Sequence, residues 1–214
     1  GCKISDCELV GGETAEMPDT YSKGKFDIAG FCAGIVEKKK ILHKHKINKN
    51  NLILAVPSSG LHSNGFSLVR HILKKKKINI LKNKFLKKEI LKPTKIYVKE
   101  VLNLIKNNLL NGCANITGGG LEDNIKRVIP KGLCAYINLD NIKTRSIFNW
   151  IKNQGVDNYE MIKIFNCGVG FCLIINYKNL NKVKKFFSKE YQPYIIGKII
   201  PGKKKIKIDG KIHW

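Results

Sequence analysis

The sequence of 214 residues lacks several features that define large classes of protein. It contains no run of about 18 apolar residues, which excludes a transmembrane helix. It contains seven cysteines but no CxxC pair, so neither a zinc site nor a disulfide framework is indicated. Reduced thiols in a cytosolic protein fit this cysteine pattern best.

Arginine is also scarce, and this scarcity bears on the meaning of the charge. The formal net charge is +24, from 40 Lys and Arg against 16 Asp and Glu, yet Arg70, Arg127 and Arg145 are the only arginines. Lys, Ile and Asn all have A/T-rich codons, so nucleotide bias in the genome explains their abundance. Nucleic-acid-binding proteins rely on arginine for bidentate and stacking contacts. The composition therefore disfavours a nucleic-acid partner, although a basic nucleic-acid-binding protein stays an alternative.

Methionine is rare, and none stands at the start of the chain. Residue 1 is Gly, the methionines are Met17 and Met161, and no signal peptide precedes the first motif. We therefore expect the chain to be the later part of a longer protein. Its 43% hydrophobic content is sufficient for the core of one or two small domains and excludes disorder of the whole chain.

Apolar patterning predicts strands and helices that intermingle along most of the chain, which indicates an α+β fold. The expected strands are 27–37, 52–56, 113–117, 134–139, 169–176, 194–200 and 205–214. The expected helices are 66–73, one of about three turns from residue 95, 121–129, 146–152, 159–164 and 180–189. The lysine-rich stretch 74–88 is expected to be a loop or a frayed helix end.

Glycine is concentrated in four segments at junctions between the expected elements: 11–18, 58–70, 117–125 and 165–170. The second and third share one design, in which a strand leads through a glycine loop to a helix N-terminus. Such a loop directs backbone N–H groups at an anion, and the helix end adds positive partial charge. Each alone is better explained as a helix-capping loop, with Ser63 or Asn64 as the cap. Together they favour a phosphorylated small-molecule ligand.

Two carboxylates, Glu13 and Glu16, lie three residues apart near the start of the chain. Carboxylates at this spacing are suitable ligands for Mg²⁺, which also accepts phosphate oxygens of a substrate. They are equally well explained as ordinary surface acids.

Six motifs occur in the order found in one enzyme family: GGETAEMP, DIAGFCAGIVEK, SSGLHSNGFSLVR, LKPTKIYVKEV, ITGGGLEDNIKRVIP and FNCGVG. On these motifs the chain resembles the phosphoribosylformylglycinamidine cyclo-ligases, also called AIR synthetases, from residue 1 to about residue 200. The HSNG segment alone would also admit the related FGAM synthetases.

The resemblance implies an α+β architecture in two parts. Residues 38–214 would form a C-terminal mixed-sheet domain with flanking helices. Residues 1–37 would be the end of an N-terminal α/β domain that binds ATP and dimerises. The resemblance further implies a cytoplasmic enzyme whose full-length parent is a homodimer, and a chain that is incomplete as a catalyst by itself.

The family's reaction would be ATP-dependent ring closure of formylglycinamidine ribonucleotide to aminoimidazole ribonucleotide in purine biosynthesis. The γ-phosphate activates the formyl amide oxygen as an iminophosphate, and an amidine nitrogen then closes the ring. The implied cofactors are ATP and Mg²⁺, and the implied partner is a small ribonucleotide, with no membrane. The alternative is a non-catalytic ribonucleotide-binding remnant or partner subunit.

The motifs also imply roles for individual residues. The catalytic assignments are His62 and Asn64. The substrate- and phosphate-binding assignments are Ser59, Gly60, Ser63, Gly65, Arg70, Gly118, Gly119, Gly120 and Asn124. The metal or nucleotide assignments are Glu13 and Glu16.

For His62, acid–base catalysis and a hydrogen-bonding or capping role are both open. Asn166 and Gly168 either shape the cleft or make a turn into a strand. Cys167 is not expected to be a nucleophile, because nothing near it in the sequence would lower its pKa.

Overall fold

A computed structural model describes all residues from Gly1 to Trp214. The chain divides into two compact units, Gly1–Ile41 and Leu42–Trp214. Each unit is described by itself below.

The first unit contains little regular structure. Its only helical segments are α1 (Cys2–Ser5) and the 3-10 turn η1 (Lys38–Lys40), and none of its residues is buried. The strand predicted over 27–37 is wrong, because these residues form no ladder and Phe31 remains 98% exposed. An apolar run becomes a strand only where neighbouring backbone pairs with it, and this unit offers no such neighbour.

The second unit is built on a six-stranded sheet of order β2-β4-β1-β5-β3-β6. Its strands are β1 (Leu52–Pro57), β2 (Gly112–Asn115), β3 (Leu133–Asn138), β4 (Val169–Ile175), β5 (Tyr194–Pro201) and β6 (Ile206–Asp209). All neighbouring strands are antiparallel except β3 and β6, which are parallel. The predicted mixed sheet and α+β class are therefore confirmed.

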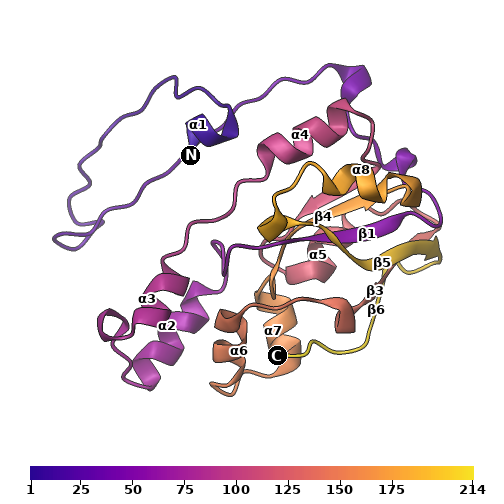
Figure 1. The fold of residues 1–214 in the computed structure, drawn as a ribbon. Coiled ribbons are helices and arrows are strands. Elements are labelled where there is room, and N and C mark those ends of the chain that lie inside the picture. Colours follow the sequence, from indigo (N-terminus) through magenta and orange to yellow (C-terminus); the bar gives the residue numbers. More distant parts are fainter. The chain divides into compact units, whose positions relative to one another are not determined.

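Helices cover both faces of this sheet, as Figure 1 shows. They are α2 (Phe66–Lys75), α3 (Lys84–Ile90), α4 (Val98–Lys106), α5 (Gly120–Lys126), α6 (Ser146–Lys152), α7 (Asn158–Ile164) and α8 (Leu180–Lys184). The 3-10 turns are η2 (Lys44–Lys46), η3 (Ile80–Lys82), η4 (Leu139–Asn141), η5 (Tyr177–Asn179) and η6 (Lys189–Tyr191).

Alternation along the central strand β1 sorts the core into two layers. Ile53 and Ala55 contribute to a large cluster that includes residues of α2, α3, α5, α6 and α7. Leu54 and Val56 contribute to a smaller cluster with residues of α4 and α8. Successive side chains of a strand point to opposite faces, so one buried strand supplies both layers. The result is a sheet between two helical layers.

Three helix predictions were wrong in extent. The stretch predicted as a loop or frayed end contains most of α3, whose first turn is capped by Asn83 through a hydrogen bond from the Leu86 N–H. The helices α5 and α8 are shorter than predicted, and each is followed by a turn. The strand predicted over 205–214 is also too long, because β6 ends at Asp209. The other expected helices and strands of this unit lie within a few residues of their predicted positions.

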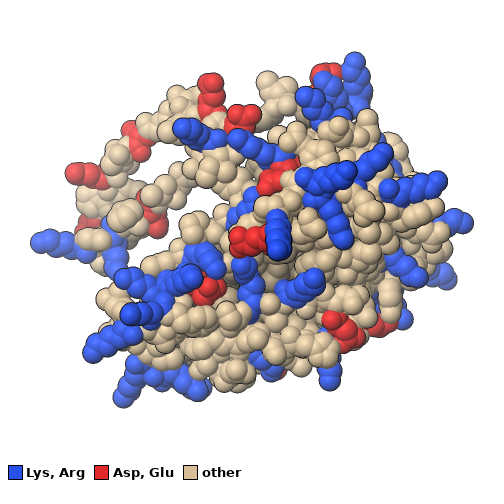
Figure 2. All heavy atoms as spheres, viewed as in Figure 1, with Lys and Arg blue, Asp and Glu red and all other residues tan.

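No helix in the structure combines the length and apolar character needed to span a bilayer. On the face of the molecule in Figure 2, Lys and Arg side chains are dispersed and do not gather into a single patch.

Candidate functional site

The strand directions bring three of the glycine segments to one edge of the sheet. Both β1 and β2 are antiparallel to β4, so β1 and β2 run in the same direction and end at the edge where β4 begins. The loop after β1 leads into α2, the loop after β2 leads into α5, and residues 165–168 lead into β4. The remaining glycine segment, 11–18, belongs to the first unit.

Asn166 connects the loop after β1 to the start of β4. Its side chain is 3% exposed, and its Nδ2 donates hydrogen bonds to the carbonyl oxygens of Gly60 (3.0 Å) and Leu61 (3.2 Å). Its Oδ1 accepts the Gly168 N–H at 2.8 Å. All of its polar atoms are therefore engaged within the protein, and Asn166 holds the loop in place.

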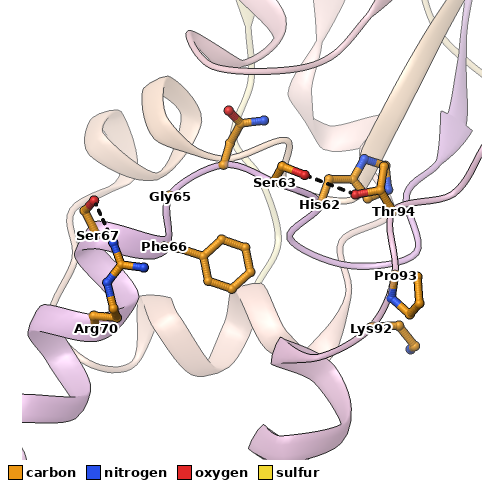
Figure 3. Close-up of a pocket in the computed structure, with 10 residues that line it drawn as sticks. His62, Ser63, Gly65, Phe66, Ser67, Arg70, Lys92, Pro93 and Thr94 are labelled. Carbon is orange, nitrogen blue, oxygen red and sulfur yellow. Dashed lines mark hydrogen bonds between the residues drawn. The ribbon is translucent and has the colours of Figure 1, made fainter. Parts of the chain in front are cut away.

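A cavity of about 670 Å³ opens on the loop after β1, and Figure 3 shows its lining. The lining residues are His62, Ser63, Asn64, Gly65, Phe66, Ser67, Arg70, Lys92, Pro93 and Thr94. Ser63 and Thr94 contact each other near His62, with 3.4 Å between their hydroxyl oxygens. The Phe66 ring lies between this end and the end formed by Ser67 and Arg70.

His62 lies at one end of this cavity and is 8% exposed. Its Nε2 accepts the Ser59 N–H at 3.1 Å. Its backbone has a φ of 57°, in the left-handed region that few non-glycine residues adopt. Burial, with a smaller effect from the positive charge of Arg145, lowers the pKa of His62 to about 4, so the imidazole is neutral at physiological pH.

The cationic residues of this cavity differ in their pairing. Lys92 forms an ion pair with Glu89, whose Oε1 lies 3.0 Å from the Lys92 Nζ. Arg70 contacts the Ser67 hydroxyl at 3.4 Å and has no ion pair with a carboxylate. No Asp or Glu lines the cavity, so the positive charge of Arg70 is not balanced by an acidic residue of the lining.

A second cavity, of about 720 Å³, joins the two glycine loops. Asn64 and Gly65 line it together with Gly118 and Gly119. A Cβ added at Gly118 would lie 3.5 Å from the Asn64 Oδ1, so the two loops are in close contact. The remaining lining is mostly charged and comes from α5 and from the region of α7: Asp123, Asp157, Tyr159, Glu160, Lys163 and Ile164.

Neither glycine loop uses a side chain to cap the helix that follows it. Gly65 is the N-cap of α2 and Gly119 the N-cap of α5, with φ of 81° and 87°, and neither helix has a side-chain cap hydrogen bond. Ser63 and Asn64 therefore do not serve as caps. Both helices present first-turn N–H groups without a capping side chain at this edge of the sheet.

Four predicted binding residues have structural roles instead of lining these cavities. The Ser59 hydroxyl donates to the Pro93 carbonyl (2.7 Å) and accepts the Lys95 N–H (3.1 Å). Gly60 is buried against the backbone of α3, and Gly120 against that of α7. Asn124 is 5% exposed, and its Nδ2 donates to three carbonyls of the second glycine loop.

Glu13 and Glu16 lie in the first unit, and both are exposed. The structure contains no group of three or more His, Cys, Asp or Glu side chains that could hold a metal ion. Magnesium commonly takes one or two carboxylates together with phosphate oxygens of a substrate, and Glu13 and Glu16 are the carboxylates that the sequence suggests for it.

Some residues that line the two cavities were not predicted from the sequence. Lys92 and Thr94 lie about 30 residues beyond His62 and come beside it because Ser59 bonds to residues on either side of Thr94. The LKPT motif was the available signal. Glu160 and Lys163 line the second cavity, and only their position shortly before the FNCGVG motif could have suggested this from the sequence.

Comparison with known proteins decides the family. Residues 48–209 match the model of the family described as AIR synthase related protein, C-terminal domain. The chain belongs to this family. The AIR synthase C-terminal fold thus accounts for most of the second unit, and the resemblance inferred from the six motifs is confirmed.

Curated relatives agree with this family. The chain is 42% identical over 210 residues to a phosphoribosylformylglycinamidine cyclo-ligase of Bacillus cytotoxicus, covering 94% of this chain and 60% of the relative. It is 40% identical to one of Prochlorococcus marinus, covering 98% and 63%. It is 38% identical to a chloroplastic one of Arabidopsis thaliana, covering 94% and 54%. The chain thus spans about three-fifths of the length of these relatives.

Solved structures share the fold at low sequence identity. Thiamine-monophosphate kinase from Stenotrophomonas maltophilia matches with a TM-score of 0.57 at 14% identity, over 83% of this chain and 56% of that one. Escherichia coli HypE, a hydrogenase maturation protein, matches with a TM-score of 0.53 at 11% identity, over 77% and 48%. PurLQS from Thermotoga maritima matches with a TM-score of 0.52 at 11% identity, over 82% and 26%. These likenesses concern the fold alone.

Proposed function

We propose that this chain supplies the ribonucleotide-handling part of a phosphoribosylformylglycinamidine cyclo-ligase. The observation that carries the proposal is the 40–42% identity to cyclo-ligases over nearly the whole chain. The reaction proposed is ATP-dependent ring closure of formylglycinamidine ribonucleotide to aminoimidazole ribonucleotide. The cytoplasm is the proposed compartment, a homodimer the proposed assembly, and no nucleic-acid partner is proposed.

The cavities support this proposal because ring closure needs a phosphorylated substrate to be held in place. The first cavity offers hydroxyls and the unpaired Arg70, which suit a phosphate group. The second cavity, between the two glycine loops, offers backbone N–H groups and charged side chains to the rest of the reactants. We propose His62, Ser63, Asn64, Gly65, Arg70, Gly118 and Gly119 as the binding residues.

The part of each relative that this chain does not match is proposed to complete the nucleotide and metal apparatus. Within this chain, Glu13 and Glu16 are the proposed contribution to it. Magnesium, when bound, would neutralise the phosphate charge of ATP. The protein's own residues bind and orient the ribonucleotide and enclose it.

The test is reconstitution. The part of the Bacillus cytotoxicus cyclo-ligase that this chain does not match is fused to this chain, and ADP release is measured with and without formylglycinamidine ribonucleotide. We expect ADP release only when the ribonucleotide is present, with aminoimidazole ribonucleotide as the product. A matched fusion carrying Arg70→Gln should show a raised KM for the ribonucleotide.

Two outcomes would contradict the proposal. A folded fusion that never releases ADP in response to the ribonucleotide, yet binds it, would instead support a non-catalytic ribonucleotide-binding protein. ADP release that ignores the ribonucleotide would assign the chain to a different ATP-using reaction.

A further inference from the structure

The hydrogen bond between Ser59 and His62 determines where the imidazole proton lies. A backbone N–H can only donate, so the Nε2 that accepts it at 3.1 Å carries no proton. The neutral ring then carries its proton on Nδ1. Nε2 is therefore unavailable to accept a proton from a substrate while this hydrogen bond is intact.

The Nδ1–H of His62 has no hydrogen-bond partner in the protein. The only hydrogen bond of the His62 side chain is the one to Ser59. The side-chain atoms that are both enclosed and unpaired lie in Ser58, Thr144 and Asn149, so Nδ1 is not sealed inside the protein. His62 is 8% exposed and lines the first cavity, so a ligand in that cavity can supply an acceptor for this donor. An unpaired donor at such a position is stabilised when a ligand oxygen accepts from it.

The surroundings fix the ring in this orientation. The Cε1 of His62 lies 2.7 Å from where a Cβ on Gly170 would stand, so only glycine allows the ring to lie there. The Tyr97 ring packs beside it with a centroid separation of 6.2 Å, and the Tyr97 hydroxyl is engaged with the Pro57 carbonyl. His62 also keeps a left-handed backbone, a conformation found where surrounding structure enforces it, often at functional sites.

The opposite end of the same cavity is positive. Arg70 has no carboxylate partner, whereas Lys92 is neutralised by the buried Glu89. The cavity therefore has one charged end and one neutral donor end, with the Phe66 ring between them. A ligand with a phosphate at one end and neutral oxygens at the other matches this arrangement.

We propose that His62 is a neutral hydrogen-bond donor, through Nδ1–H, to an oxygen of a phosphorylated ribose whose phosphate lies at the Arg70 end of the cavity. The identity of the ligand rests on the proposed function, whereas the donor role rests on the hydrogen bond to Ser59. His62 is on this account a substrate-binding residue and not a general acid or base.

The first experiment reads the tautomer and its response to ligand. The whole chain is labelled with ¹⁵N, and the ring nitrogens of His62 are followed by NMR during titration with ribose 5-phosphate. We expect a protonated Nδ1 and an unprotonated Nε2 at neutral pH, and a shift of the Nδ1–H signal on binding. His71, which is exposed on α2 and does not line the cavity, is the internal control.

The second experiment uses variants chosen for the left-handed backbone, which Asn and Gly both tolerate. His62→Gly removes the donor, and we expect it to weaken ribose 5-phosphate binding by roughly tenfold or more. His62→Asn supplies an amide N–H near the position of Nδ1, and we expect binding within about threefold of the parent chain. The matched control His71→Asn should bind as the parent does.

Three results would overturn the inference. The first is a protonated Nε2 in the free protein. The second is a His62 signal that does not move although ribose 5-phosphate binds. The third is a cavity that binds ADP but not ribose 5-phosphate. None of these measurements depends on ATP consumption, so the cyclo-ligase reaction can fail while this inference stands, and the reverse also holds.

Discussion

Burial sets the protonation state of single residues in and beside the site. His62 illustrates the effect on charge, because its pKa of about 4 in the folded chain lies below the value of 6.5 expected when it is unfolded. Cys167 illustrates the effect on reactivity, because burial raises the pKa of its thiol to about 12. In both cases the charged form is disfavoured by removal from water.

The pH dependence of stability should report the burial of His62. Between about pH 6.5 and pH 4 the unfolded chain binds a proton at this residue and the folded chain does not, so the free energy of unfolding falls as the pH falls through this window. The His62 contribution to the fall should be on the order of 2–3 kcal/mol. Urea unfolding at several pH values measures it. The His62→Asn variant should show a shallower fall, and an unchanged slope would contradict the assignment.

Exposed cysteines should react with alkylating reagents, and buried cysteines should not. Cys167 is 2% exposed and contacts the Met161 carbonyl through its Sγ, whereas Cys2 and Cys32 are exposed. We expect iodoacetamide at neutral pH to alkylate the exposed cysteines and to leave Cys167 unmodified in the native chain. Mass spectrometry of peptides locates the modification. Alkylation of Cys167 at the rate seen for Cys32 would show that the fold opens there.

Elements contribute by holding the glycine loops against one another. The second loop is fastened by Asn124 on α5, whose Nδ2 lies 2.8 Å from the Gly120 carbonyl oxygen, 3.2 Å from that of Gly118 and 3.3 Å from that of Thr117. The first loop is fastened by Asn166 just before β4. In both cases an amide side chain supplies N–H donors to backbone carbonyls of the loop.

Replacement of Asn124 should therefore loosen the second cavity. In Asn124→Ala the carbonyls lose their donor, and the expected cost is about 1–3 kcal/mol in the free energy of unfolding. Asn124→Asp should cost more, because a carboxylate would face carbonyl oxygens. Thermal or urea unfolding measures both. The exposed Glu122→Gln, two residues away on the same helix, is the control and should change stability little. Equal stability of Asn124→Ala and the parent would refute the bracing role.

At the scale of the whole molecule, the hydrophobic core belongs to one unit. Every buried residue of the two core clusters lies between Ile47 and Ile212, and Gly1–Ile41 contains none. The energy of apolar burial is thus confined to Leu42–Trp214.

A chain reduced to residues 42–214 should therefore keep its stability. We expect its thermal midpoint to lie within about 2 °C of the value for the full 214 residues, because no buried apolar area is removed. Calorimetry of the two chains makes the comparison. A much lower midpoint for the shorter chain would mean that Gly1–Ile41 contributes to the core.

Local sequence determined the type and approximate place of most elements. Apolar runs around residues 54 and 172 predicted β1 and β4, and helical spacing after residue 66 predicted α2. Local sequence also placed glycine loops before α2 and α5, and the six motifs were sufficient for the family. It failed at 27–37, where an apolar run has no strand to pair with, and at α3, where the lysines concealed a helix.

Only the tertiary structure decided how these pieces form a site. Asn166 reaches Gly60 across 106 residues, and Thr94 reaches Ser63 across 31. The first contact exists because β1 pairs with β4, and the second because the Ser59 hydroxyl bonds to Pro93 and Lys95. Both depend on long-range pairing that no local pattern encodes. The charge state of His62 was hidden for the same reason, since a pKa depends on burial and neighbours in space, and not on neighbours along the chain.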